Sequence, residues 1–211
     1  MAPEAAVLAI VEVPRPQHVP GFAIRRKMRE SIPEYEGLSG LEFKAYSLAR
    51  ASGSYGGLYL WSDGDSAHAW FSPDWFERVE RERGVTPKVR FFRVLSIVDT
   101  VPGGTPRDSR SKTVASLLML SPKSVFADFS SQSLQGFVAA DQHVPGLLRR
   151  YRVMDADGRS GVLSIWQNAA AAKSLMNNST ESEAEWFDTP ILLPSILLSN
   201  KSGEADSERA P

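Results

Sequence analysis

Several side chains in the first half of this chain could bind and activate a small organic molecule. Tyr59 and Trp61 lie two residues apart in an apolar segment, so in a strand both would point to one side. His68 could act as a general base near neutral pH, and Lys44 could hold an oxyanion. We predict catalytic roles for Tyr59, Trp61 and His68. We predict substrate-binding roles for Lys44, Tyr46, Trp70, Trp75, Arg150 and Trp166.

Each of these assignments competes with a structural explanation. Large aromatic residues such as Tyr59, Trp61 and Trp70 often fill the core between a sheet and a helix. Trp75 follows a helix-capping segment, where packing would also explain it, and His68 could be a surface residue. The residue types alone leave both explanations open.

Two arginines in the second half could bind an anion. Arg150 and Arg152 alternate with Tyr151 on a predicted strand, so they share one face. Charged residues on an edge strand can instead serve solubility. Trp166 occupies the position in the second half that corresponds to Trp61.

The chain repeats one ground plan in its two halves. Trp61 and Trp166 are 105 positions apart and end the similar segments YGGLYLW and SGVLSIW. Gly40 and Gly146, each placed before a predicted strand, are 106 positions apart. A repeat of this length predicts two copies of one folded unit, a fused pseudo-dimer, rather than a solenoid.

Three sequence signals predict the order β-α-β-β-α-β in each half: alternating apolar residues, turn residues and helix-capping residues. In the first half we expect strands at 7–13, 41–48, 57–61 and 89–98, with helices at 22–30 and from 62 onward. We expect Pro33 to end or kink the first helix. In the second half we expect strands at 114–120, 147–154, 162–166 and 191–198, with helices at 169–176 and at 126–142, interrupted near Gly136. The predicted domains are a first unit at 1–100, a linker at 101–112, a second unit at 113–200 and a disordered tail at 201–211.

Composition and missing motifs exclude several classes of protein. The 24 basic and 25 acidic residues nearly balance, so attraction to nucleic acid or to an anionic membrane is not expected. An RNA-recognition module has the same element order, but its third strand needs a basic residue, a glycine and alternating exposed aromatics. The segment 54–61 supplies serine, tyrosine, two glycines and leucine at the corresponding places. The absence of cysteine excludes disulfides, thiolate nucleophiles and zinc ribbons. We predict no metal site, no signal peptide and no membrane span, and we expect a cytoplasmic location.

Four segments of the first half resemble the dimeric α/β-barrel proteins and, among them, the YdhR-type monooxygenase-like family. These segments are GGLYLW at 56–61, AHAWF at 67–71, SPDW at 72–75 and GVTP at 84–87. The acidic cap at 62–65 and the apolar strand after GVTP belong to the same resemblance. Members are single ferredoxin-like units that dimerise through their sheets. The resemblance therefore implies an α+β fold: two tandem ferredoxin-like units with antiparallel sheets, packed as an intramolecular dimeric α/β barrel. The second half departs from the family pattern, with NNST at 177–180 in place of the SPDW segment.

The resemblance also implies a pocket between helices and sheet. We predict a cofactor-independent, monooxygenase-like protein that oxidises a small phenolic or quinol-type compound, with haem as an alternative cofactor. Such a substrate gives an electron to O2 itself, while the protein orients it, deprotonates it and excludes water. The alternatives are a non-catalytic protein that binds a small hydrophobic or aromatic molecule, and a cyclase or isomerase. The better-preserved first half is expected to hold the active pocket, and assembly beyond the pseudo-dimer is left open.

Overall fold

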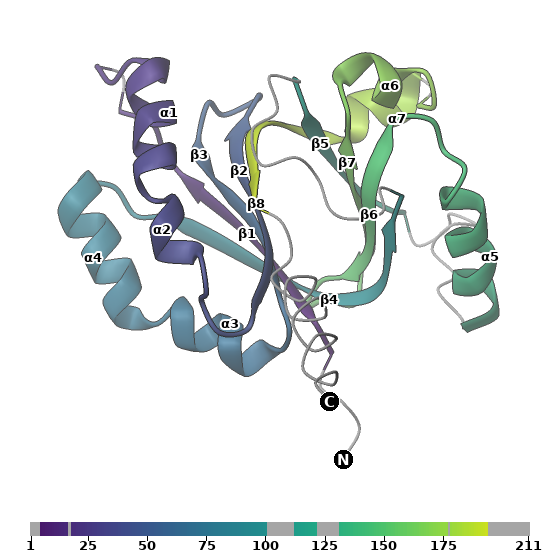
Figure 1. Ribbon diagram of the computed structural model, residues 1–211, viewed down its shortest axis with the longest axis horizontal. Coiled ribbons are helices and arrows are strands. Elements are labelled where there is room, and N and C mark those ends of the chain that lie inside the picture. The colour runs from purple at the N-terminus through teal and green to yellow at the C-terminus, as the bar shows by residue number, and fades with distance from the viewer. Residues whose placement is uncertain (1–4, 17, 101–111, 122–130, 177, 194–211) are drawn as a thin grey trace, which may run out of the picture.

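The structure, a computed structural model, describes residues 5–16, 18–100, 112–121, 131–176 and 178–193. Within these ranges eight strands close into a barrel, and the helices lie outside it (Figure 1). This architecture confirms the predicted α+β fold of two ferredoxin-like units that share one barrel. The predicted tail and all but one residue of the predicted linker lie outside the described residues.

Each half contributes four strands. The elements of the first half are β1 (Val7–Val13), α1 (Gly21–Glu30), α2 (Ile32–Tyr35), β2 (Leu41–Ala49), β3 (Tyr55–Trp61), α3 (Gly64–Trp70), α4 (Pro73–Arg83) and β4 (Lys88–Asp99). Those of the second half are β5 (Val114–Met119), α5 (Ser131–Asp141), β6 (Leu147–Met154), β7 (Ser160–Trp166), α6 (Ala169–Lys173), α7 (Asn178–Glu183) and β8 (Glu185–Leu193). Helices α1 to α4 cover one side of the barrel and α5 to α7 the other (Figure 1). None of the described helices has the length and apolar character needed to cross a membrane.

All neighbouring strands are antiparallel, in the closed order β1-β3-β2-β8-β5-β7-β6-β4. The first four strands form a sheet in the order β4-β1-β3-β2, and the last four repeat it as β8-β5-β7-β6. Two strand pairs join these sheets, β2 with β8 and β4 with β6. Each junction therefore pairs the second strand of one unit with the fourth strand of the other, as two-fold symmetry would require.

The two halves also match in register. Lys44 pairs with Tyr59 between β2 and β3, and Arg150 pairs with Ser164 between β6 and β7. The offsets between these pairs are the 106 and 105 positions of the sequence repeat. Both strand pairs also have a register shift directly after their first pair of residues. The repeated sequence segments thus occupy equivalent places in the barrel.

Equivalent glycines precede β2 and β6. Gly40 and Gly146 have φ angles of 78° and 72°, a region that other residues rarely adopt. There is also no room for a side chain at either position. A Cβ on Gly40 would lie 2.4 Å from Oγ of Ser66, and one on Gly146 would lie 2.5 Å from Cβ of Ala171. Conformation and close packing therefore both require glycine.

We expect Gly146→Ala to lower the free energy of unfolding by about 1–3 kcal/mol, because alanine is strained at this φ. The control is Gly136→Ala in α5, where a Cβ would meet nothing within 4 Å. That change should raise stability by about 0.5–1 kcal/mol, since alanine favours a helix interior. Denaturant titration of both variants measures the difference. Equal stability of Gly146→Ala and the wild type would contradict the prediction.

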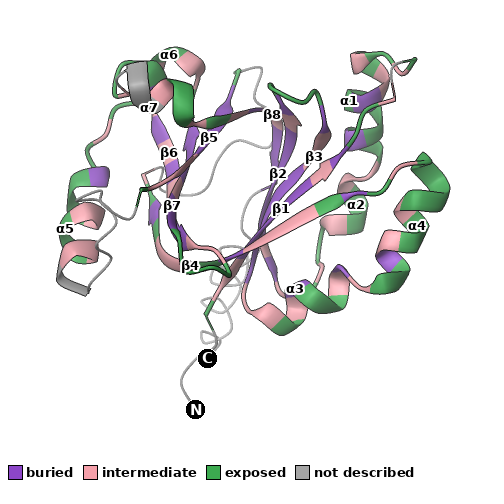
Figure 2. Ribbon diagram, turned by 180° about the vertical axis from the view of Figure 1, so that it is seen from behind, coloured by how far each residue is buried: buried purple, intermediate pink, exposed green. Residues whose placement is uncertain are grey.

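Apolar side chains fill the interior of the barrel. All eight strands contribute to one core, which includes Leu8, Phe43, Leu58, Tyr151 and Leu163. An eight-stranded barrel is just wide enough for its side chains to fill it. The intervening residues point outward, where the helices cover them and form further cores. Figure 2 accordingly shows buried strands beneath helices whose outer faces are exposed. Ligand sites are thus expected between the sheet and the helices.

Two local predictions are wrong. Strand β8 begins at Glu185 and includes Pro190, whereas the sequence placed the last strand at 191–198; residues 194–198 lie outside the described part. Pro190 is tolerated because the pairing with β2 shifts register there, so no ladder hydrogen bond is lost. Helix α5 continues through Gly136 without interruption. The predicted interruption at Pro33 is confirmed: α1 ends at Glu30, and Pro33 lies in the first turn of the separate helix α2, where no intrahelical amide is needed.

Candidate functional site

Among the cavities lined by the described residues, two lie at equivalent places on the outer face of the barrel, one in each half. The first has a volume of about 180 Å³ and lies between β1, β2 and β3 and helices α1, α2 and α4. The second has a volume of about 700 Å³ and lies between β5, β6 and β7 and the helices of the second half. Their strand positions correspond: Lys44, Tyr46 and Tyr59 in the first match Arg150, Arg152 and Ser164 in the second.

Lys44 lines the first cavity, although only 1% of its surface is exposed. Its Nζ lies 2.8 Å from the ring centre of Tyr35. The ring centres of Tyr46 and Tyr59 lie 4.0 and 4.5 Å from the same atom. These tyrosines come from α2, β2 and β3 respectively. Three phenol rings from three elements therefore surround one amine.

Burial lowers the pKa of Lys44 well below its ordinary value of 10.5, because the charged ammonium loses its hydration. Glu34, at the cavity mouth, has the opposite but smaller effect. The faces of the tyrosine rings attract an ammonium ion and so support the protonated form when it arises. Lys44 can therefore accept a proton and later return it.

Burial shifts the pKa values of the three tyrosines in the opposite direction from that of Lys44. Burial raises the pKa of Tyr35, Tyr46 and Tyr59, because a phenolate would be poorly solvated there. At neutral pH all three are protonated phenols that can donate a hydrogen bond. The hydroxyl of Tyr46 lies 2.9 Å from Oγ of Ser31, which fixes its position. The proton acceptor of this cavity is thus Lys44 and not a tyrosine.

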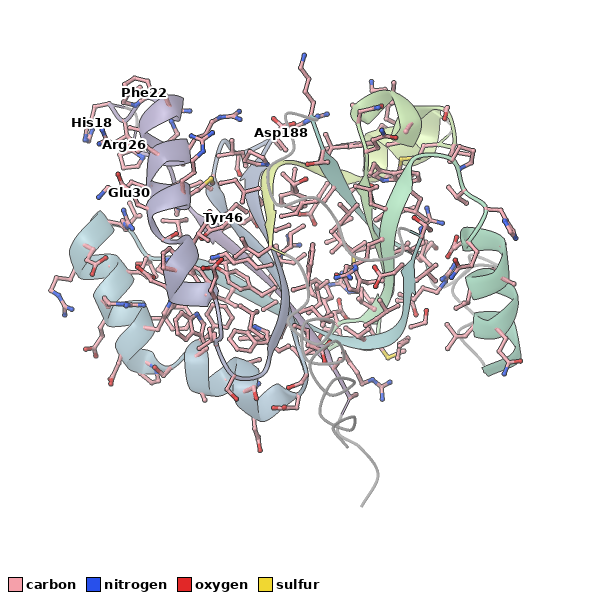
Figure 3. The ribbon with its side chains drawn as sticks, in the orientation of Figure 1. His18, Phe22, Arg26, Glu30, Tyr46 and Asp188 are labelled. Carbon is pink, nitrogen blue, oxygen red and sulfur yellow. The ribbon has the colours of Figure 1, made fainter. Side chains whose placement is uncertain are left out.

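Helix α1 closes the cavity with its apolar side. Ile24 and Met28, four residues apart and so on one helix face, are buried in a cluster with Tyr46. Figure 3 shows Tyr46 on the sheet side of α1, whereas Phe22 and Arg26 mark its outer side. The apolar face of α1 therefore keeps water from the tyrosines.

The mouth of the first cavity is charged. Five exposed residues line it: Lys27, Glu34, Arg78, Glu82 and Arg83. Three cations against two anions give the mouth one excess positive charge. An anionic or easily ionised ligand is therefore favoured at the entrance.

The second cavity contains a buried cluster of charged residues instead of tyrosines. Arg150 and Arg152 form ion pairs with the two carboxylate oxygens of Asp141, at 2.5 and 2.6 Å. Arg150 also donates from Nε to Oγ of Ser164 and lies 5.3 Å from the ring centre of Trp166. Two guanidinium groups against one carboxylate leave one positive charge in this cluster.

The structure places six of the nine residues that the sequence singled out in one or other of the two cavities. Four of them line the first cavity: Lys44, Tyr46, Tyr59 and Trp75. Two line the second cavity: Arg150 and Trp166. The remaining three line neither cavity: Trp61, Trp70 and His68.

Trp61 and His68 lie outside the first cavity for different reasons. The Trp61 ring stacks on Tyr59 with ring centres 6.5 Å apart, so it supports the cavity wall from the far side. Trp70 adjoins the same cluster, 5.7 Å from the ring of Tyr35. His68 is exposed on α3, with its ring 4.7 Å from Phe91.

Sequence reasoning missed Tyr35 and Asp141. Tyr35 belongs to a four-residue helix, which is too short to produce a periodic pattern. Asp141 ends α5 and gives no local signal. The available signal was indirect, since two arginines on one buried face require a carboxylate partner.

Neither cavity offers a histidine to a haem. Histidine is its common axial ligand, and none of His18, His68 and His143 lines a cavity. The first cavity, at about 180 Å³, is close in size to the roughly 150 Å³ cavity that holds benzene, so a tetrapyrrole exceeds it. The described residues also contain no cluster of histidine and carboxylate side chains that could hold a metal ion.

No protein-family model and no curated protein matches this chain. Its fold is nevertheless similar to solved structures. A Fusobacterium nucleatum protein named "putative monooxygenase" superposes with a TM-score of 0.64 at 9% identity, covering 90% of this chain and 95% of that one. A Lactobacillus acidophilus protein with the same name gives 0.60 at 14% identity, covering 92% and 99%.

A third similar structure is an anthrone oxidase-like protein, with a TM-score of 0.54 at 12% identity, covering 90% of this chain and 93% of that one. At such low identities the likeness concerns the fold and does not extend to substrate or mechanism. The chain thus has the ferredoxin-like barrel fold of proteins named as monooxygenases.

Proposed function

We propose that the first cavity is the active site of a cofactor-independent oxygenase that acts on a small phenolic compound. One observation carries the proposal: the buried amine of Lys44, which readily exists in its neutral form, is enclosed by three protonated tyrosines. The fold supports it, because the similar structures include two proteins named as monooxygenases and one named anthrone oxidase-like.

Lys44 activates the substrate by removing a proton. The phenolic O–H gives its proton to Nζ, and the resulting ammonium is held by the tyrosine rings and by the phenolate itself. Neutral tyrosines cannot compete for this proton. They can instead donate hydrogen bonds to oxygen atoms that become negatively charged during the reaction.

The reaction is balanced with the substrate and O2 as its only two reactants. The phenolate transfers one electron to O2, and the resulting radical and superoxide combine to form a C–O bond at a ring carbon. The ammonium of Lys44 returns its proton to the distal peroxide oxygen. Loss of the proton from that ring carbon then breaks the O–O bond and releases water. One oxygen atom becomes the new quinone carbonyl, and the other leaves in water.

The volume of the cavity limits the substrate. About 180 Å³ accommodates one substituted aromatic ring, by comparison with the benzene cavity. A second ring would extend into the charged mouth. The substrate class is therefore a phenol, hydroquinone or naphthol rather than a compound with three fused rings.

We also infer that the chain arose by tandem duplication of one unit of the YdhR-type family. The shared offsets, register shifts and glycine positions of the two halves support this origin. Under this proposal the first cavity carries out proton transfer through Lys44. The second cavity has Arg150 at the equivalent position and has lost this function.

The test is oxygen uptake by the purified protein with a series of phenols, hydroquinones and 1-naphthol. We expect uptake above the protein-free rate, and with ¹⁸O2 one labelled oxygen atom in the product. Isomerised product without oxygen uptake would instead identify an isomerase. Binding without any turnover would identify a carrier of small aromatic molecules. Either result would overturn the proposed oxygenase activity.

A further inference from the structure

We propose that the second cavity is a separate binding site for a small carboxylate with an apolar body, such as an aryl carboxylic acid. This inference concerns a different half of the chain and does not depend on oxygenase activity in the first cavity. It rests on the charge, the hydrogen bonding and the lining of the second cavity.

The first argument is the unbalanced charge. Asp141 and Arg152 are 4% and 5% exposed, so their charges are held almost entirely away from water. Asp141 neutralises only one of the two guanidinium groups that it contacts, Arg150 and Arg152. Burial of a charge without a partner is costly, and a bound monoanion would remove that cost. Glu183, exposed at the rim, disfavours a ligand with two negative charges.

The second argument is an unused donor. Nη1 of Arg152 is buried and has no hydrogen-bond partner among the residues that the structure describes. Buried donors are almost always paired, so a free one beside a cavity indicates a missing acceptor. Nη2 of Arg152 already pairs with Asp141, so Nη1 is the donor left to bind one oxygen of a carboxylate by a charge-assisted hydrogen bond.

The third argument is the apolar lining around these arginines. Trp166 lies beneath Arg150, and Phe137 lies 4.8 Å from the guanidinium carbon of Arg152. Leu118, Val162 and Met176 complete the apolar surface. At about 700 Å³ the cavity has room for a body of one or two rings. The ligand is therefore amphipathic, and a simple inorganic anion would leave this surface uncovered.

Comparison of the two cavities explains the difference in chemistry. Lys44, which can exchange a proton, and Tyr46, which can donate a hydrogen bond, are replaced by Arg150 and Arg152 at the equivalent strand positions. Arginine stays charged at any physiological pH, so it binds anions and does not act as a base. The second half thus retains the position of the pocket and changes its use from proton transfer to anion binding.

The test uses the full chain and two probes of similar shape, 1-naphthoate and the neutral 1-naphthalenemethanol. Isothermal titration calorimetry at pH 7 should show at least tenfold tighter binding of 1-naphthoate. Arg152→Gln should weaken that binding at least tenfold, because a charge-assisted pair is lost. Lys44→Met should leave it unchanged, since Lys44 lies in the other cavity. In ¹H–¹⁵N spectra, 1-naphthoate should shift the indole N–H of Trp166, which lines the second cavity.

Several outcomes would overturn the proposal. Equal affinity for the two probes would remove the role of the carboxylate, and full binding by Arg152→Gln would remove the role of the arginine. Loss of binding in Lys44→Met would place the probe in the first cavity. If Arg152→Gln does not fold, the indole N–H measurement on the wild type decides: an unchanged Trp166 signal at saturating 1-naphthoate refutes the site.

Discussion

The Lys44→Met variant is expected to lose oxygen uptake and, at the same time, to unfold less readily than the wild type. Removal of a general base typically lowers the rate by about 10²–10⁴-fold. Methionine keeps most of the side-chain volume, so the three tyrosines around it can remain in place. The activity loss is measured as kcat/KM for the best phenolic substrate.

The stability gain follows from the burial of Lys44. A buried polar group without full compensation costs about 1–3 kcal/mol, so we expect Lys44→Met to raise the free energy of unfolding at pH 7 by that amount. Thermal and denaturant unfolding measure it. Opposite changes in activity and stability are the signature of a residue kept for its chemistry.

Lys44 should make the free energy of unfolding of the wild type rise with pH. The folded protein has a lowered Lys44 pKa, so between that pKa and 10.5 the unfolded chain binds more protons than the folded one. The stability contributed by this residue therefore rises with pH through that window and is complete above 10.5. The advantage of Lys44→Met should accordingly be largest at low pH and smallest at high pH, where only the cost of burying the neutral amine remains. The wild-type kcat/KM should also rise with pH through the Lys44 pKa, because the neutral amine is the active form.

A suitable control is Lys88→Met, because Lys88 is exposed on β4 and lines neither cavity. It should change stability by less than about 0.5 kcal/mol, as surface substitutions usually do. Its oxygen uptake should equal that of the wild type. A Lys44→Met variant that is well folded and fully active would refute the role of Lys44.

The largest loss of stability is expected for Asp141→Asn. This change leaves the buried guanidinium groups of Arg150 and Arg152 side by side without a counter-charge. Removal of one partner of a buried ion pair typically costs about 3–5 kcal/mol. Because Asp141 ends α5 and the arginines lie on β6, the contact of this helix with the barrel should weaken as well. Denaturant titration measures the change.

The matched control is Asp188→Asn. Asp188 pairs with Arg50 at 2.7 Å, but both side chains are more than one third exposed, so the pair is worth at most about 1 kcal/mol. Figure 3 shows Asp188 at the edge of the molecule, away from α5. Similar losses in the two variants would contradict the importance assigned to burial.

The strand faces were predictable from the sequence because side chains alternate along a strand. This regularity placed Tyr59 and Trp61 on the same face of β3, which the structure confirms. It likewise placed Arg150 and Arg152 on the same face of β6. It could not tell which residue of a face lines a cavity. Tyr59 does so, whereas Trp61 packs two residues further along the same strand.

His68 illustrates the opposite case. A histidine in a helix is chemically attractive, but its role depends on the side of the helix that meets the sheet. Helix α3 buries Ala67 and leaves its neighbour His68 exposed. One residue along a helix turns the side chain by about 100°, which is enough to move it from the core to the surface.

The sequence by itself determined the order of strands and helical segments in each half and the glycines that precede β2 and β6, because these follow from local conformational preferences. Only the tertiary structure decided that Tyr35 lies over Lys44 and that Asp141 lies between Arg150 and Arg152. These contacts depend on how short helices pack on the sheet, which no periodic pattern records. The lowered pKa of Lys44 likewise arises from complete enclosure by several elements, and desolvation of this kind exists only once they are assembled.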